Sequence, residues 1–166
     1  MLRFLAPLVL ACLFAAPGAA SAQEERTETY KDWTLRCPAE RTPPCVLHQR
    51  LVNDEQNQLL EVVIDYRPAE KLHTLLLELP LGIFLPAGAA IVIDETKEFP
   101  GLRLSRCLAG GCLVEDQASA ELLAAMRAGQ KASVVVGMPD GRKLAIVFSL
   151  QGFTAALAAL DQANAQ

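Results

Sequence analysis

The chain has 166 residues, of which 52% are hydrophobic and 20% are charged, and its formal net charge at pH 7 is −4. This length fits one domain with a sizeable core. An acidic chain without a basic stripe lacks the electrostatic footprint of a nucleic-acid-binding protein, and it has no charge-driven affinity for anionic lipid. We therefore expect no nucleic-acid partner.

The first 22 residues have the pattern of a secretory signal peptide. Arg3 precedes an apolar run over residues 4–16, and the small residues at 20–22 form a cleavage site. Cleavage between Ala22 and Gln23 leaves 144 of the 166 residues, with fourteen Lys and Arg against nineteen Asp and Glu. Cys12 would leave with the leader, the alternative being a lipidated Cys12. No later run is long enough to span a bilayer, so we expect no transmembrane segment after cleavage.

Residues 23–29 are polar and without periodicity, which predicts a flexible leader before a single β-rich domain over residues 30–162. Alternation of apolar and polar side chains predicts strands in the first half of this domain. Trp33, the only tryptophan, is expected in the core rather than in a binding site. The four strands are expected at residues 33–37, 45–52, 59–67 and 73–79.

Residues 79–94 are the most apolar part of the mature chain. Pro80 and Pro86 exclude a helix through it, and Pro86-Ala87-Gly88 has the spacing of a type II turn. We therefore predict a buried strand, a turn and a second buried strand, with a membrane-inserting loop as the alternative. A charged stretch follows, and Pro100-Gly101 is expected to turn the chain.

The rest of the chain predicts two hairpins and two helices. Residues 102–114 form a hairpin around Gly110 and Gly111, and residues 131–150 form another around Asp140-Gly141. Helical spacing predicts a helix at 119–128 that ends at Gly129, and a C-terminal helix from Phe153 that frays after Asp161, leaving 163–166 as a tail. The expected fold class is all-β and mainly antiparallel, a sandwich or open barrel of about nine short strands with two short covering helices.

Four cysteines remain after cleavage, and they allow three pairings that sequence alone does not resolve. Cys107 and Cys112 flank a hairpin loop at a distance that a disulfide spans, and Cys37 and Cys45 flank a loop of turn-forming residues. Local pairing of both is the simplest arrangement and requires an oxidising compartment. A four-cysteine zinc site is the alternative, although the spacings are loose for it.

Signatures of hydrolases, phosphate-binding loops, helical zinc pairs and redox C-x-x-C motifs are missing from the sequence, so we expect no catalytic residues, no metal and no cofactor. His48 and His73 lie on predicted strands, where they are structural or, alternatively, share a metal site with Glu61 or Asp65. Strand carboxylates give a second alternative, a hydrolase whose acid and base converge. The candidates are Glu61, Asp65, Glu78 and Asp94.

An ordered set of motifs resembles the invasion-associated locus B family of exported bacterial proteins. The set comprises W-x-L-x-C from Trp33, C-x-x-x-Q from Cys45, the segment Leu79–Asp94, the C-x4-C pair and SLQGFTAALAAL from Ser149. Glu95 stands where this family pattern has a glycine, which puts the following turn in question.

The resemblance implies an envelope or secreted protein, linked in some members to host-cell invasion, and implies no reaction. We therefore expect a non-enzymatic exported β-domain, periplasmic or secreted in a Gram-negative-type bacterium, that binds a protein or an envelope component. A secreted or surface adhesion or invasion factor is the alternative. Oligomeric state and binding residues are not predicted.

Overall fold

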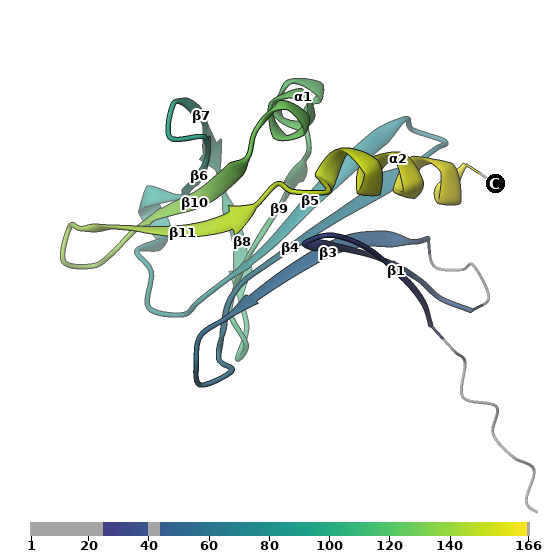
Figure 1. Cartoon of the computed structure of the whole chain (residues 1–166). Coiled ribbons are helices and arrows are strands. Elements are labelled where there is room, and N and C mark those ends of the chain that lie inside the picture. The colour runs from purple at the N-terminus through teal and green to yellow at the C-terminus, as the bar shows by residue number, and fades with distance from the viewer. Residues whose placement is uncertain (1–24, 40–43, 166) are drawn as a thin grey trace, which may run out of the picture.

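The computed structural model describes residues 25–39 and 44–165. Within these ranges the chain forms eleven β-strands and two α-helices (Figure 1). The strands are β1 (Arg26–Tyr30), β2 (Trp33–Cys37), β3 (Val46–Val52), β4 (Gln58–Arg67), β5 (Leu72–Leu79), β6 (Ala89–Ile93), β7 (Lys97–Leu102), β8 (Leu104–Cys107), β9 (Cys112–Gln117), β10 (Lys131–Gly137) and β11 (Lys143–Ser149). The helices are the 3-10 helix η1 (Leu85–Ala87), α1 (Ala120–Ala128) and α2 (Phe153–Asn164). The signal peptide, its cleavage site at Ala22 and Gln23, and Cys12 lie outside the described residues.

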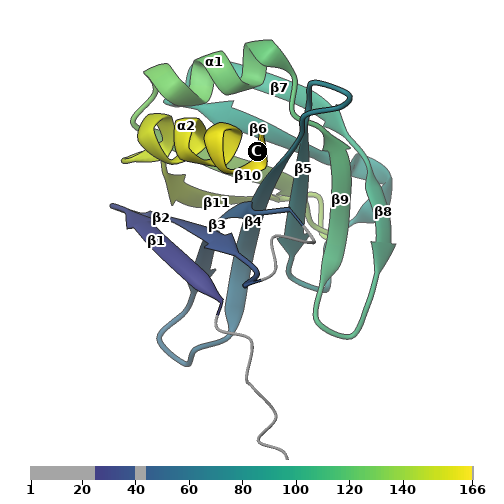
Figure 2. The ribbon, with the colours of Figure 1, turned by 90° about the vertical axis from the view of Figure 1, so that its right-hand side faces the viewer.

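The strands form two antiparallel sheets (Figure 2). The large sheet has the order β1-β2-β3-β4-β5-β9-β8, and the small sheet has the order β11-β10-β6-β7. Each sheet has two open edges, and α2 packs against β1 to β4. These findings confirm the predicted fold class, with eleven strands in the described residues instead of about nine.

Alternating side chains place one face of each sheet in the core. On β4 and β5, Val62 faces Leu77 and Ile64 faces Leu75, and all four side chains are buried. Trp33 is fully buried, as predicted, with its ring 5.0 Å from that of Phe153 in α2 and 6.3 Å from that of Phe148 in β11. This one side chain therefore joins both sheets and a helix.

Both α-helices follow the predicted pattern. The Ser119 hydroxyl accepts the Leu122 N–H and caps α1, and the apolar faces of α1 and α2 are buried. Gly129 ends α1 with φ −82°, so it is not required for a left-handed backbone. The position has no room for a larger residue, because a Cβ there would lie 2.6 Å from Ile93 Cγ2.

The prediction of a flexible leader over residues 23–29 was wrong for residues 26–29. Residues 26–30 form β1, which pairs with β2 from Arg26 opposite Cys37 to Tyr30 opposite Trp33. The strand carries no apolar alternation because it lies at the sheet edge with most of its side chains exposed. Backbone pairing, not burial, defines it.

The predicted tail at residues 163–166 was also wrong, because α2 continues to Asn164. The turn expected at Pro100-Gly101 is instead part of β7, an edge strand with a register shift opposite, where a missing N–H is tolerated. Between β5 and β6 the expected first buried strand is a loop with η1, from which Phe84 and Leu85 project.

Candidate functional site

Both locally paired disulfides are present, Cys37–Cys45 and Cys107–Cys112. The first joins the end of β2 to the residue before β3 and lines a cavity of about 430 Å³ between the β1–β2 hairpin and α2. The second closes the β8–β9 hairpin, in which Cys107 is the register partner of Cys112.

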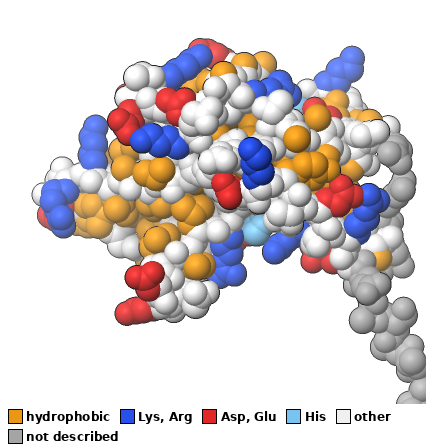
Figure 3. Space-filling view, viewed as in Figure 1, with side chains coloured by type: hydrophobic (Ala, Val, Ile, Leu, Met, Phe, Trp, Pro, Cys, Tyr) orange, Lys and Arg blue, Asp and Glu red, His pale blue; other side chains and the backbone are white. Residues whose placement is uncertain are grey.

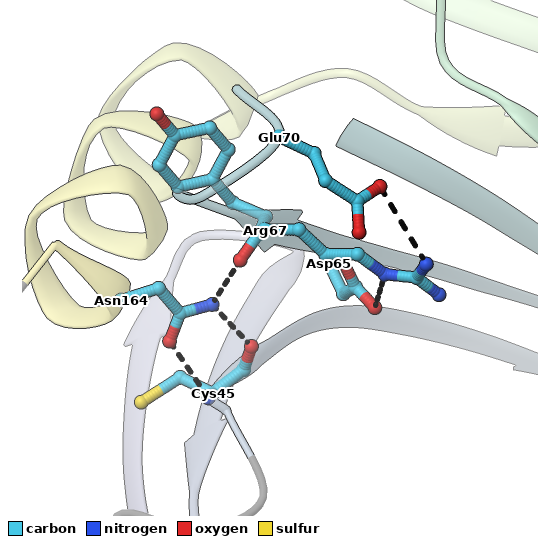
Figure 4. Close-up of polar contacts among 6 residues, drawn as sticks. Cys45, Asp65, Arg67, Glu70 and Asn164 are labelled. Atoms are coloured by element: carbon cyan, nitrogen blue, oxygen red, sulfur yellow. Dashed lines mark hydrogen bonds and ion pairs between the residues drawn. The ribbon is translucent and has the colours of Figure 1, made fainter. Parts of the chain in front are cut away.

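Asn164, at the end of α2, holds this helix against the large sheet (Figure 4). Its Oδ1 accepts the Cys45 N–H at 2.8 Å, and its Nδ2 donates to the carbonyls of Cys45 at 2.9 Å and Tyr66 at 3.1 Å. One amide therefore links α2, β4 and the residue that precedes β3. This contact explains why the last turn of α2 is ordered.

The two histidines lie on opposite faces of the large sheet, so the shared metal site considered for them is not formed. His73 Nε2 lies 2.6 Å from Asp161 Oδ1 of α2, and its ring stacks on Tyr66. His48 lies on the outer face, with its Nε2 2.8 Å from Glu61 Oε1. Burial, and then the charge of Arg36, lower the pKa of His48 against the opposing effect of Glu61. No group of three potential metal-ligating side chains occurs in the described ranges.

The four strand carboxylates do not converge on one pocket. Glu61 and Glu78 face each other across β4 and β5, and Asp65 lies further along β4. A cavity of about 440 Å³ on this outer face is lined by Asp65 but not by Glu61 or Glu78. Asp65 Oδ2 lies 3.9 Å from Arg67 Nε, as Figure 4 shows. Asp94 is remote from them, in the β6–β7 turn, where it accepts the N–H groups of Gln130 and Lys131.

Gln49, on the inward face of β3, joins the two sheets. Its side chain is buried, its Oε1 accepts the Ser149 N–H at 3.1 Å, and its Nε2 donates to the carbonyls of Asp32 at 2.8 Å and Ser149 at 3.2 Å. Sequence reasoning did not select it as a site residue. The sequence did contain a signal for this contact: a glutamine at an inward strand position, between Leu47 and Leu51, must find hydrogen-bond partners when it is buried.

A cleft opens beside this glutamine, between β11 and β3. The ribbons of β11 and of the β3–β4 hairpin diverge in Figure 1. Its volume is about 660 Å³. The β11 wall contributes Val147, Phe148 and Ser149, and the opposite wall contributes Gln49, Arg50 and Leu51. β11 is the edge strand of the small sheet, so this wall carries unpaired backbone groups.

Exposed hydrophobic side chains adjoin the cleft over the β10–β11 hairpin (Figure 3). The outer face of the small sheet presents Val147, which is 54% exposed, then Ala145 and its cross-strand partner Val135. The η1 segment continues this surface, since a Cβ at Gly137 would meet Phe84 and Ala87. We refer to Phe84, Leu85, Val135, Ala145 and Val147 as the apolar strip.

Comparisons with known proteins agree on one family. The family model described as invasion associated locus B (IalB) protein matches residues 33–161. Two invasion protein B homologs, from Brucella abortus (strain 2308) and from Brucella abortus biovar 1 (strain 9-941), are each 35% identical over 149 residues, which cover 87% of this chain and 83% of the relative. The crystal structure of invasion associated protein B from Bartonella henselae superposes with a TM-score of 0.76 at 25% identity, and the match covers 85% of this chain and 99% of that chain.

The matched range contains both disulfides, the apolar strip and, apart from Asp32, the residues of the Gln49 bridge and of the cleft. No helix in the described ranges has the length and apolarity needed to cross a membrane. The disulfides together with the family indicate an exported protein. By its sequence and its structure, the chain belongs to the invasion associated locus B protein family.

Proposed function

We propose that this protein is a non-enzymatic binding module of the bacterial envelope, acting in the periplasm or outside the cell, and that its partner is another protein. The signal-peptide pattern and the two disulfides support an oxidising destination. The dispersed carboxylates support binding over catalysis, because Asp94 caps a turn and Glu61 contacts His48.

The apolar strip is the observation that carries this proposal. Phe84 and Leu85 are 48% and 49% exposed, and in the part of the chain that the structure describes they adjoin the outer face of the small sheet, on which Val147 is 54% exposed. Adjacent exposed apolar side chains beside a cleft are typical of protein-binding surfaces. The cleft adds a concave surface, with polar groups of Gln49 and Arg50 at its wall.

Site-specific crosslinking in the native bacterium tests the proposal. A photoreactive residue in place of Leu85 is expected to crosslink a discrete envelope protein, whereas the same residue in place of Gln117, exposed on β9, is not. Leu85→Asp combined with Val147→Asp should abolish the complex but leave the unfolding transition intact. An identical crosslinking pattern at both positions, or no product at Leu85, would contradict a protein-binding role for this surface.

The names of the relatives favour a second candidate, a surface or secreted factor that acts on host cells. This function requires that the protein be accessible outside the bacterium. Antibody labelling of intact cells and host-cell uptake of a deletion strain distinguish the two. A protein that is labelled only after the outer membrane is opened, with normal uptake of the deletion strain, would exclude this candidate.

A further inference from the structure

We infer that the partner engages this protein by strand addition: an extended segment of the partner pairs with the open edge of β11, inside the cleft that Gln49 closes. This inference rests on the proposed function and specifies its mode of recognition. The evidence lies in the hydrogen-bond pattern of β11, in the Gln49 contacts and in the charges along the cleft.

The hydrogen-bond pattern shows which groups of β11 face outward. The Leu150 N–H donates to Gln130 and the Met138 N–H to Arg142, so even-numbered residues of this hairpin pair with β10. The N–H and carbonyl groups of Lys143, Ala145, Val147 and Ser149 therefore point to the open edge. Ser149 binds Gln49, whereas the other three lie on the edge that no strand of the described chain covers.

Gln49 already occupies one position of such a strand. Its amide accepts from the N–H and donates to the carbonyl of the same residue, Ser149, as the peptide groups of a paired strand do. In the described part of the chain the edge of β11 is open up to Ser149, where the Gln49 side chain ends the cleft. An added segment would pair with Val147 and Ala145 and would leave toward the hairpin tip at Asp140.

The charges along the cleft favour an acidic and apolar segment. Lys143, at the start of β11, forms no ion pair within the described ranges. Arg50 lines the cleft from β3, where its register partner is Glu61, and Lys131 is paired with Glu95. Asp32 is the acidic residue of the lining and lies at the closed end, where Gln49 binds its carbonyl. Carboxylates on the segment would pair with Arg50 and Lys143, and its apolar side chains would lie beside Val147.

A second copy of β11 fits this edge less well. The strand reads KLAIVFS and has no acidic residue, so a paired copy would bring another Lys143 and no carboxylate. We therefore assign the edge to a segment of a different protein.

A capped peptide that alternates valine and glutamate, with threonine at both ends, serves as the probe. Titrated into the ¹⁵N-labelled mature protein, it is expected to shift the amide signals of Ala145 and Val147 and to slow their hydrogen exchange. Val147→Pro removes one outward N–H, which an edge strand tolerates, and should weaken binding about tenfold. Val147→Ala keeps the N–H and is the matched control, with a loss of about twofold.

A second pair of substitutions tests the preference for an acidic segment without placing a proline in the strand. Arg50→Glu combined with Lys143→Glu should reverse the preference, so that a peptide with lysine in place of glutamate binds better than the acidic one. Both side chains are exposed. Because Arg50→Glu places a carboxylate opposite Glu61, a small fall in the urea midpoint is expected, and both peptides are compared on the same folded, doubly substituted protein.

Three outcomes would overturn strand addition. One is the absence of amide shifts up to the solubility limit of the peptide, and another is protection centred on Phe84 and Leu85 without Ala145 and Val147. The third is peptide-free self-association that Val147→Pro abolishes, which would make a second copy the occupant. Retention of the Leu85 crosslink in Val147→Pro would leave the binding function standing without this mode, whereas loss of all crosslinks in the native protein would remove the function itself.

Discussion

Two residues of the β6–β7 turn, Asp94 and Glu95, adopt positive φ angles of 46° and 63°. The Thr96 N–H donates to the Ile93 carbonyl, so the pair occupies the two central positions of a β-turn within the three-residue loop between Ile93 and its register partner Lys97. Asp94 suits this conformation, and its carboxylate caps the N–H groups of Gln130 and Lys131. Glu95 does not suit it, and the resemblance of the sequence to the family led us to expect a glycine at this position.

Glu95→Gly should therefore stabilise the protein. Glycine adopts the left-handed backbone without a Cβ clash, and the lost contact of the exposed Glu95 with Lys131 is a weak surface ion pair. The expected rise in the midpoint of thermal unfolding is about 3 °C. Glu95→Gln, which removes the charge and keeps the strained backbone, should not raise the midpoint. An equal rise in both variants would show that charge, not backbone strain, limits this turn.

His48 makes stability depend on pH at a single residue. Because burial and Arg36 lower its pKa in the folded state, the unfolded chain binds the proton more readily. The stability that neutral His48 contributes is present above the unfolded pKa of about 6.5 and is lost as the pH falls below it.

Urea unfolding at pH 7.5 and pH 5.5 measures this effect. The wild-type protein should lose more stability between the two values than His48→Gln, whose side chain stays neutral. Arg36→Gln should give an intermediate loss, because it removes the second cause of the low pKa. An equal loss in wild type and in His48→Gln would place the pH dependence elsewhere.

At the scale of elements, the sequence predicts those strands whose side chains alternate between core and solvent. β4, β5, β10 and β11 follow this rule, and both helices follow the helical period. β1 and β7 do not show this alternation, because these edge strands are held by backbone pairing and expose most of their side chains. The η1 loop was predicted as a buried strand because it is apolar, but its Phe84 and Leu85 side chains are exposed to solvent.

The end of α2 shows how a polar contact extends an element beyond its apolar pattern. Asn164→Ala would leave the Cys45 N–H and the carbonyls of Cys45 and Tyr66 without this partner. We expect a loss of about 2 kcal/mol in the free energy of unfolding, measured with urea. A chain that ends at Gln162 should lose at least as much.

Asn164→Asp is the matched control, because it keeps an acceptor for the Cys45 N–H and loses both donated hydrogen bonds. It should be nearly as destabilised as Asn164→Ala. A wild-type midpoint in the truncated chain would mean that the last turn of α2 contributes nothing to the fold.

At the scale of the molecule, the candidate site arises where the two sheets meet. Motif and composition identified the family and the disulfides, but the cleft depends on which sheet edges remain open, and that is decided by the order of strands far apart in sequence. Gln49 illustrates the limit. It appears in the motif that begins at Cys45, yet only the fold places it within 3.2 Å of Ser149, a hundred residues away.

Gln49→Met tests how much this bridge holds the sheets together. The methionine fills a similar volume but leaves the Ser149 N–H and the Asp32 carbonyl without their buried partner, while Trp33 Nε1 still donates to the Ser149 carbonyl. We expect a loss of about 3 kcal/mol in the free energy of unfolding, measured by urea unfolding. Gln49→Glu, which keeps only the acceptor, should be destabilised as well. A loss below about 1 kcal/mol in Gln49→Met would show that apolar packing around Trp33 joins the sheets without the amide.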